Sequence, residues 1–410
     1  MSGYRLIHRE RILGEDIAIW SSALTPLIRR RKATRTKNGD EAISWRFWAA
    51  CSDGLIRVYL VREVSISQKE TELTASAISF GEDPTHILRP SSENSGVLGC
   101  TSLSILRNYA GDDDSAGNVI IAGMDLSGTI RIWELDENFD EELYDQGSKA
   151  HSEIPPKVEL ELQGATGTAV ALGPPRTVIP QLKCLIAAVA FQDGTVSLVS
   201  TGIAVPNAVQ DKKYTVPEPG TILNSWGAGS AMACRLVFRP DHAQLAVSRQ
   251  DGTVDVIALS ATDQTTERLH RLSPLVTSPS RGLAFTTDGQ MMIAGNDQGR
   301  LTIWDLSEPN RIPAIANHQV GGTSGNSWLW QIAPVDGRRF ASLATDSTIK
   351  IWQVDQVHHQ PLHIFASSDD IRLWSISMQA LKFGDVQNPL RLVAGSESGW
   401  VMVYSMVDKV

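Results

Sequence analysis

The amino-acid sequence predicts an all-β chain that folds as a single seven-bladed β-propeller. Three observations predict this fold. One short pattern, a tight turn followed by an alternating strand, recurs seven times along the 410 residues. An apolar strand that ends in small residues precedes most copies, as in Ile120–Gly123. Only a few residues follow the last copy, so its blade should be completed by an N-terminal strand near Tyr4–His8, which would close the ring.

Each copy of the pattern has the features of a strand entered through a tight turn. Gly supplies the left-handed backbone that the turn needs, and a preceding Asp can bond back to the backbone. The Val, Ile and Thr residues that follow alternate as in a half-buried strand. The copies begin at Asp53, Ser127, Asp193, Asp251, Gln298, Asp346 and Ser398. We expect the four turn aspartates, Asp53, Asp193, Asp251 and Asp346, to have a structural role.

In this interpretation one domain spans residues 1–410. The first three intervals between copies are longer than the last three, and the excess lies in polar or irregular stretches. Long surface insertions cost little free energy. We therefore interpret the regions near residues 29–42, 65–99 and 136–157 as surface loops.

Amino-acid composition and charge narrow the classes of protein to which this chain can belong. The net charge of −9 and the pI near 5.5 argue against a general nucleic-acid binder. The four cysteines are scattered without a C-x-x-C pair, so neither a disulfide framework nor a zinc site is expected. No signal peptide or membrane-length apolar run is visible. We expect a cytoplasmic or nuclear protein with no metal, no cofactor and no membrane contact.

The residues at the upper ends of the innermost strands are the candidate binding positions. Alignment on the turns gives, for blades one to seven, Trp20, Thr101, Thr168, Cys234, Arg281, Trp330 and Trp374. The three Trp residues fall on contiguous blades, and Trp328 lies two residues before Trp330. Trp is enriched among residues that dominate binding energy. The alternative interpretation is that these rings fill gaps between blades, since Trp is usually largely buried.

Two charged segments accompany this rim. Glu15, Asp16, Asp369 and Asp370 would give the rim a negative edge suited to a partner that carries Arg or Lys, or they are simply solvated. The basic run at 29–37 could be a nuclear-import signal, a nucleic-acid contact or a solvated insertion. No G-x-S-x-G or H-E-x-x-H motif is present, and nothing pairs carboxylates in one cleft. We therefore expect no enzymatic activity.

The repeats resemble those of the WD-repeat family. Trp304-Asp305 carries the full dipeptide of that family, and Trp133-Glu134 and Trp352-Gln353 approximate it. The Gly-His pair that usually opens a repeat is absent, so we expect the buried Asp–His network of the family to be eroded. Several stretches are similar to the superkiller-complex WD-repeat subunits, mainly in blades one, five, six and seven: Glu15–Ala23, Asn326–Ala333, Phe340–Ser342, Asp346–Trp352, Asp370–Ile376 and Leu392–Tyr404.

The closer resemblance implies a non-catalytic scaffold subunit, a monomeric propeller within a hetero-complex. Such subunits bridge an RNA helicase and a tetratricopeptide-repeat scaffold in exosome-dependent 3′–5′ mRNA decay, and in some lineages serve an elongation complex or meiotic recombination. The resemblance places the partner on the upper face, at Trp20, Trp328, Trp330 and Trp374, beside which we include Arg281, Asp16 and Asp370. The alternative is another WD-repeat adaptor, such as a ubiquitin-ligase substrate receptor, a trafficking factor or a ribosome-assembly factor.

Overall fold

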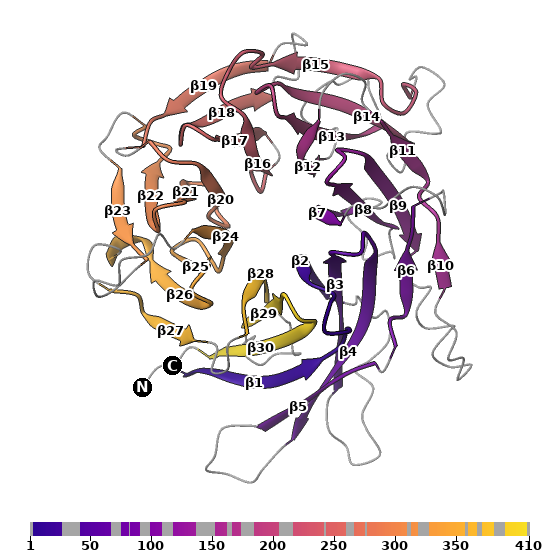
Figure 1. Cartoon of the computed structure of the whole chain (residues 1–410). Coiled ribbons are helices and arrows are strands. Elements are labelled where there is room, and N and C mark those ends of the chain that lie inside the picture. Colours follow the sequence, from indigo (N-terminus) through magenta and orange to yellow (C-terminus); the bar gives the residue numbers. More distant parts are fainter. Residues whose placement is uncertain are drawn as a thin grey trace.

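The computed structural model is a closed ring of seven blades around a central channel, which confirms the predicted fold class (Figure 1). Each blade contains four antiparallel strands in meander order. The structure describes residues 3–26, 42–66, 75–81, 83–90, 99–108, 118–136, 152–161, 166–173, 184–204, 216–241, 243–259, 266–274, 277–309, 313–318, 328–356, 360–366, 371–380 and 390–407.

The second strand of each blade is almost completely buried, and the innermost strand lies beside the channel. The innermost strands surround the channel and are β2 (Ile19–Pro26), β7 (Cys100–Asn108), β12 (Gly167–Gly173), β16 (Ala233–Phe238), β20 (Ser280–Phe285), β24 (Leu329–Pro334) and β28 (Leu373–Ala380). The second strands are β3 (Ala42–Cys51), β8 (Asn118–Asp125), β13 (Cys184–Phe191), β17 (Gln244–Arg249), β21 (Met291–Asn296), β25 (Arg339–Ala344) and β29 (Leu390–Ser396).

The third strands are those that the recurring pattern predicts. They are β4 (Ile56–Ile66), β9 (Ile130–Asp136), β14 (Val196–Ala204), β18 (Val254–Leu259), β22 (Arg300–Asp305), β26 (Thr348–Gln353) and β30 (Trp400–Val407). The outer strands are β6 (His86–Leu88), β11 (Val158–Leu160), β15 (Ile222–Trp226), β19 (Thr266–Leu272), β23 (Ala314–Asn317), β27 (His363–Ala366) and, in blade seven, β1 (Gly3–Arg11).

The turns between second and third strands have the geometry that their sequence requires. The glycine of six turns has a positive φ, for example 80° at Gly54 and 86° at Gly128. In blade six Ser347 takes this position with φ of 59°. The turn aspartates each accept a hydrogen bond from the backbone N–H two residues later, at 3.2, 2.8, 3.0 and 3.0 Å for Asp53, Asp193, Asp251 and Asp346.

The N-terminal strand closes the ring as predicted. β1 pairs with β30 in antiparallel register from Gly3↔Val407 to Arg11↔Trp400 and completes blade seven. A buried ion pair adds a second link at this seam. Arg391 of blade seven donates from Nε to Glu63 of blade one at 3.1 Å, and from Nη1 to Ser405 at 2.8 Å. The seam is therefore fastened by backbone pairing and by a fully desolvated charge pair.

Parts of the regions interpreted as surface loops form strands. β6, the outer strand of blade one, lies within residues 65–99, and β5 (Ala75–Phe80) in the same region pairs with the far end of β4. β10 (Ser152–Ile154) pairs in parallel with β6 before the chain continues into β11 of blade two. Blade two thus contributes a strand that covers the edge of blade one, and an edge strand paired in this way has fewer free hydrogen-bonding groups.

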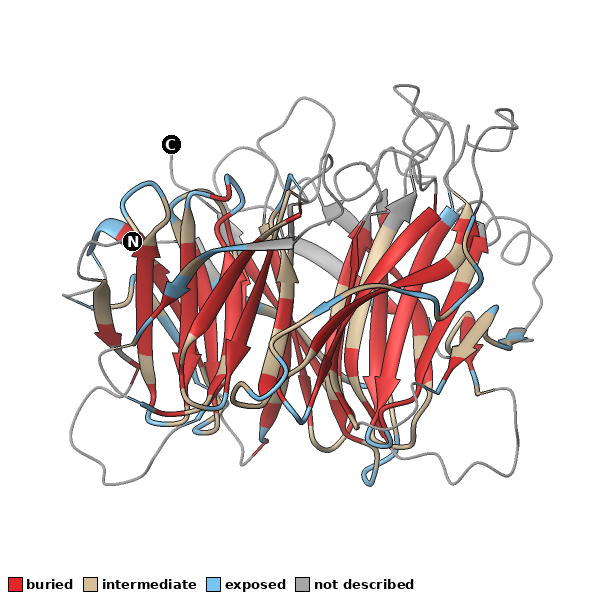
Figure 2. Cartoon of the chain, turned by 90° about the horizontal axis from the view of Figure 1, so that it is seen from above, coloured by how far each residue is buried: buried red, intermediate tan, exposed pale blue. Residues whose placement is uncertain are grey.

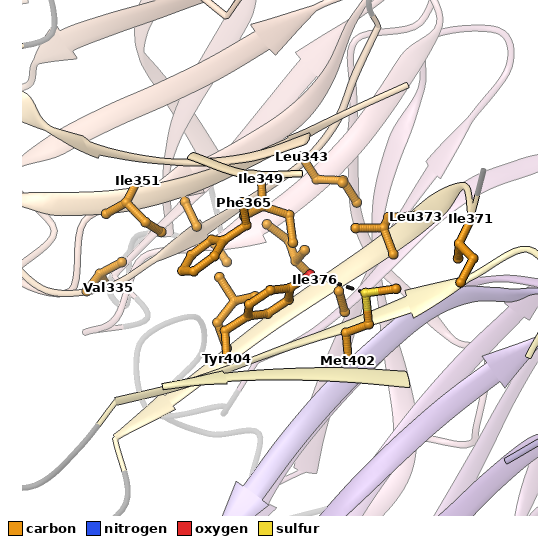
Figure 3. Packing of buried hydrophobic residues seen from close by; sticks show 14 residues of the cluster. Val335, Leu343, Ile349, Ile351, Phe365, Ile371, Leu373, Ile376, Met402 and Tyr404 are labelled. Carbon is orange, nitrogen blue, oxygen red and sulfur yellow. Dashed lines mark hydrogen bonds between the residues drawn. The ribbon is translucent and has the colours of Figure 1, made fainter. Parts of the chain in front are cut away.

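The hydrophobic core lies between neighbouring blades, along the buried strand faces coloured red in Figure 2. Figure 3 shows the contact of blades six and seven, where Phe365 and Tyr404 meet with ring centroids 4.4 Å apart. Small residues at the ends of the second strands permit this approach. A Cβ on Gly295 would lie 2.8 Å from the Leu329 side chain, and one on Gly395 would lie 2.6 Å from Ile19. A side chain at either position would force the blades apart.

Blade six contradicts the expected erosion of the Asp–His network. The buried His318 contacts Ser342 through Nδ1 at 2.9 Å and Thr348 through Nε2 at 2.8 Å. Trp352 Nε1 donates to the same Ser342 hydroxyl at 2.7 Å, and Asp346 accepts from Thr348. Asn317 stands before His318 where the family pattern has Gly, and the backbone still places the imidazole. The absence of the Gly-His pair was therefore a poor indicator for this blade.

Candidate functional site

A cavity of about 470 Å³ occupies one mouth of the central channel. All seven residues obtained by aligning the innermost strands lie on its wall: Trp20, Thr101, Thr168, Cys234, Arg281, Trp330 and Trp374. Each of them is the second residue of its strand. We call this circle of seven residues the rim. The structure thus brings together side chains that are up to several hundred residues apart in the chain.

A β-bulge explains why the rim residues face the channel. In all seven innermost strands the ladder register shifts across the rim residue, for example between Ile19 and Ser21 and between Leu329 and Gln331. A bulged residue has no partner on the neighbouring strand, and the local twist redirects its side chain. The residue before it, such as Ile19 or Leu329, stays buried between the blades.

Blades six, seven and one form an aromatic arc, which we define as Trp328, Trp330, Trp374 and Trp20. The Trp330 and Trp374 rings lie 4.8 Å apart between centroids and tilt by 35°, and Trp328 meets Trp330 edge-on at 5.4 Å. Trp328 is 39% exposed, whereas the other three are partly buried. The arc therefore combines large apolar surface with access from solvent, which is the composition of a protein-binding hot spot.

Arg281 holds one end of the aromatic arc in place. Its guanidinium lies over the Trp328 ring at 5.0 Å and near the Trp330 ring at 5.6 Å. The same group donates to both carboxylate oxygens of Asp297, at 2.7 and 3.0 Å. A bidentate pair fixes the plane of the guanidinium, so stacking on it fixes the rings as well.

Trp20 is positioned by the absence of a side chain on Gly99. A Cβ at residue 99 would lie 2.3 Å from Cζ3 of Trp20, a distance that no real structure permits. The indole therefore packs directly against this backbone, at the link between blades one and two. Substitution of Gly99 would displace Trp20 from the cavity wall.

The opposite side of the rim, on blades two to four, is polar and small. The Thr101 and Thr168 hydroxyls donate to the carbonyls of Met124 and Ala233, at 3.3 and 2.7 Å. Burial raises the pKa of the Cys234 thiol to about 11, which keeps it protonated at neutral pH. Leu126, 50% exposed, adds one apolar side chain to this half of the wall.

The predicted acidic edge is only partly described. Glu15 pairs with Arg11 of the same chain, and Asp16 is exposed in the loop before β2. Asp369 and Asp370 lie outside the described residues, and so does the basic run at 29–37. The expectation of a partner that carries Arg or Lys stays a prediction.

Two long polar side chains are notable among the cavity residues that escaped the sequence analysis. Arg235 and Gln331 each follow a rim residue and lie on the cavity wall. Aligning the innermost strands one position further would have found them, because the other residues at that position are small: Ser21, Ser102, Ala169, Gly282 and Ser375.

The described residues contain no group of three or more His, Cys, Asp or Glu side chains placed to hold a metal ion. Among the same residues, no helix has the length and apolarity that crossing a membrane requires.

Comparison with known proteins gives short, distant matches. No protein-family model matches the chain. The chain is 30% identical over 86 residues, 20% of its length, to a protein of Arabidopsis thaliana named as a non-functional target of rapamycin complex subunit, LST8-2, covering 28% of that protein. It is 26% identical over 120 residues, 29% of its length, to the LST8 homolog of Drosophila melanogaster, covering 36% of that protein.

A third match, 23% identical over 172 residues, is to the U3 small nucleolar RNA-associated protein 15 of Saccharomyces cerevisiae, covering 41% of this chain and 32% of that protein. The seven-bladed ring and these matches support the WD-repeat propeller family. The alignments span about a third of the length of each curated relative. None of these three relatives is named as a superkiller-complex subunit, so that closer resemblance stays a prediction.

Proposed function

We propose that this WD-repeat propeller is a non-catalytic scaffold that binds a partner protein through the aromatic arc. The observation that carries the proposal is the convergence of Trp20, Trp330 and Trp374 from three contiguous blades on one solvent-accessible cavity, with Trp328 exposed beside them. Rings that only filled gaps between blades would be buried there, as Trp45 and Trp48 are in blade one. Exposed aromatic clusters usually mark interaction sites.

The finer proposal follows the resemblance to superkiller-complex subunits. In that case the partner is a helical tetratricopeptide-repeat scaffold, which in turn links the propeller to an RNA helicase for 3′–5′ mRNA decay. The names of two matched relatives favour a second candidate, a subunit of another assembly: one is named as a non-functional target of rapamycin complex subunit, and one as a U3 small nucleolar RNA-associated protein. Both candidates use a protein-binding face and differ in the partner.

Affinity purification of the tagged chain from its native cells, followed by mass spectrometry, separates the candidates. Recovery of a helical-repeat protein with a helicase supports the first, and recovery of a target of rapamycin complex or of a U3 small nucleolar RNA complex supports the second. The double variant Trp330→Ala, Trp374→Ala should weaken binding by about 30-fold or more, since one hot-spot truncation alone costs about 2 kcal/mol.

The matched control is Trp226→Ala, on the outer strand β15 of blade three and away from the cavity. It should bind as the wild type does. If the double variant keeps the wild-type melting temperature and binds its partner normally, the aromatic arc is not the binding site.

A further inference from the structure

Arg235 is an unpaired cation inside the cavity. It follows the rim residue Cys234 on β16 and extends into a layer of the channel where most equivalent residues are small. Within the part of the chain that the structure describes, no carboxylate pairs with its guanidinium and no acceptor contacts it. The other arginine on the wall, Arg281, is neutralised by Asp297.

The surroundings of Arg235 disfavour its charge. Burial lowers the pKa of its guanidinium, and no carboxylate counteracts the effect. Arg235 is partly buried, and a partly buried charge without a carboxylate partner adds little to the stability of the fold, so a role in binding accounts for its place on the cavity wall. The position tolerates small residues in other blades, so packing does not explain an arginine here.

The cavity wall offers hydrogen-bond donors, and the carboxylate among its residues is already paired. Gln331 accepts a hydrogen bond from the Ile376 backbone N–H at 3.0 Å through Oε1, which leaves its amide hydrogens for the cavity. Asp125, the carboxylate on the wall, is already occupied: Oδ1 accepts from the Ser127 and Thr129 backbones, and Oδ2 from Arg131 at 2.6 Å.

We propose that the cavity receives the carboxylate of a Glu or Asp side chain of the partner protein, held by Arg235 and the Gln331 amide. This inference rests on the proposed function, because the same partner segment would lay apolar residues on the aromatic arc. A planar guanidinium fork fits a carboxylate bidentately. The single positive charge of Arg235 balances the single negative charge of a carboxylate. It would not balance the larger negative charge of a phosphate group. The volume of about 470 Å³ accommodates one side chain and its neighbours.

The first test needs no partner. Arg235→Gln removes a partly buried charge that has no partner among the described residues, so the melting temperature should stay the same or rise. Arg338→Gln, which changes the same net charge in the exposed turn between β24 and β25, is the control and should leave it unchanged. A marked fall in the melting temperature of Arg235→Gln alone would show that the guanidinium stabilises the fold, and would overturn the proposal.

The second test measures specificity with a phage-displayed library of random short peptides. Peptides selected by the wild type should share a Glu or Asp at a fixed position beside apolar residues. A synthetic copy with that Glu replaced by Gln should bind about 10- to 100-fold more weakly, the range expected for a hydrogen-bonded charge. Arg235→Gln should bind both peptides equally, Arg235→Lys should keep part of the preference, and Arg338→Gln should behave as the wild type.

The outcomes separate this inference from the proposed function. Peptides that depend on Trp330 and Trp374 but show no acidic preference, or prefer Arg or Lys, would overturn the acidic-residue proposal and leave the aromatic arc as the binding site. Peptides that bind equally well to Trp330→Ala and Trp374→Ala, or no selected peptide at all, would contradict both.

Discussion

Blades two and four contain the same buried ion pair with its charges exchanged. In blade two, Asp125 ends the second strand and Arg131 is the second residue of the third strand, with Arg131 Nη1 2.6 Å from Asp125 Oδ2. In blade four Arg249 ends the second strand and Asp255 is the second residue of the third, with Arg249 Nε 2.7 Å from Asp255 Oδ2. All four side chains are almost completely buried.

The difference between the blades lies in what else each pair contacts. Asp125 also accepts from the N–H groups of its own turn, and Arg131 has a second carboxylate, Glu159, at 2.7 Å. Arg249 donates instead to two carbonyls, those of Gly194 in the blade-three turn and Ala231, both at 2.9 Å. In blade two the additional hydrogen bonds of the ion pair stay within the blade, whereas in blade four Arg249 also bonds to the turn of blade three. In these two blades a pair of opposite charges fills the same position in either order, and the order decides where the remaining hydrogen bonds go.

Reversing one charge in blade four should have the largest effect. Arg249→Asp places two carboxylates together in the core and leaves two carbonyls without donors, so we expect a loss of about 4 kcal/mol or more in the free energy of unfolding. Adding Asp255→Arg restores the order seen in blade two and should recover about 2 kcal/mol, measured by denaturant unfolding as a double-mutant cycle.

The recovery should remain incomplete, since an arginine at position 255 starts from another strand and the carbonyls of Gly194 and Ala231 lose their donor. Arg338→Asp, a reversal in the exposed turn between β24 and β25 of blade six, is the control and should cost little. A double variant no more stable than Arg249→Asp would show that the exchange of charges between blades two and four has no energetic meaning.

Blade six also has a charged residue at this position, but its hydrogen-bond partner is a neutral carbonyl group. Lys350 occupies the position of Arg131 and Asp255, and its ammonium donates to the carbonyl of His318. Burial and the nearby Lys350 lower the pKa of His318 to about 3, against about 6.5 in the unfolded chain. Between these values the unfolded state binds one proton more, so stability is full above pH 6.5 and falls as the pH drops. From pH 7 to pH 5 this contributes a loss of about 2 kcal/mol.

His318→Gln supplies the reference for that measurement. The variant is less stable at pH 7 because it alters the hydrogen bonds to Ser342 and Thr348, and its stability should fall less between pH 7 and pH 5. Parallel pH dependences for the wild type and His318→Gln would contradict a neutral, buried imidazole.

Asp125→Asn should be milder than any change at Arg249. The amide keeps an oxygen for the turn N–H groups, and Arg131 retains Glu159 as a counter-charge. We expect a loss of about 1 to 2 kcal/mol in the free energy of unfolding by chemical denaturation. The combination with Glu159→Gln, which removes that counter-charge, should cost clearly more than the sum of the single changes; simple additivity would argue against the local network of blade two.

The smallest effect concerns the turn of blade six. Ser347 is the non-glycine residue that takes a left-handed conformation, with φ of 59°, at the position where the other six blades have Gly. Ser347→Gly relieves about 1 kcal/mol of backbone strain and gives up a long hydrogen bond, 3.3 Å, to the Leu373 N–H. A gain of about 0.5 kcal/mol, seen as a small rise in melting temperature, is expected. Gly128→Ser in blade two is the reciprocal control and should destabilise, because its Cβ would lie 2.3 Å from the Gly167 nitrogen.

The repeat pattern was enough to predict the ring, because turn glycines and alternating β-branched residues act locally. It also gave the closing strand, since a blade with three strands leaves an unpaired edge. The seven rim positions followed from alignment alone. The bulge that turns them towards the channel did not, because it depends on the register with a second strand.

Other features were beyond the sequence for definite physical reasons. The His318 network depends on where the backbone places the imidazole. The identity of the preceding residue, which is not the Gly of the family pattern, wrongly indicated that the network was absent. Arg235 became visible only when its surroundings showed that nothing neutralises it. In the ion pairs of blades two and four, the two charged residues are six positions apart in the sequence. An alignment of the repeats shows this shared spacing, whereas neither pair stands out when its blade is considered alone.

The pairing of β1 with β30 also fixes when the fold can be completed. Closing a loop of about 400 residues costs about 3 kcal/mol more entropy than closing one of about 10. At translation rates of about 5 to 20 residues per second, the first strand of the chain waits roughly 20 to 80 seconds for the last to be synthesised. The ring is therefore sealed only after β30 has been synthesised, and until then the nascent chain exposes an unpaired edge strand to the ribosome surface and to chaperones.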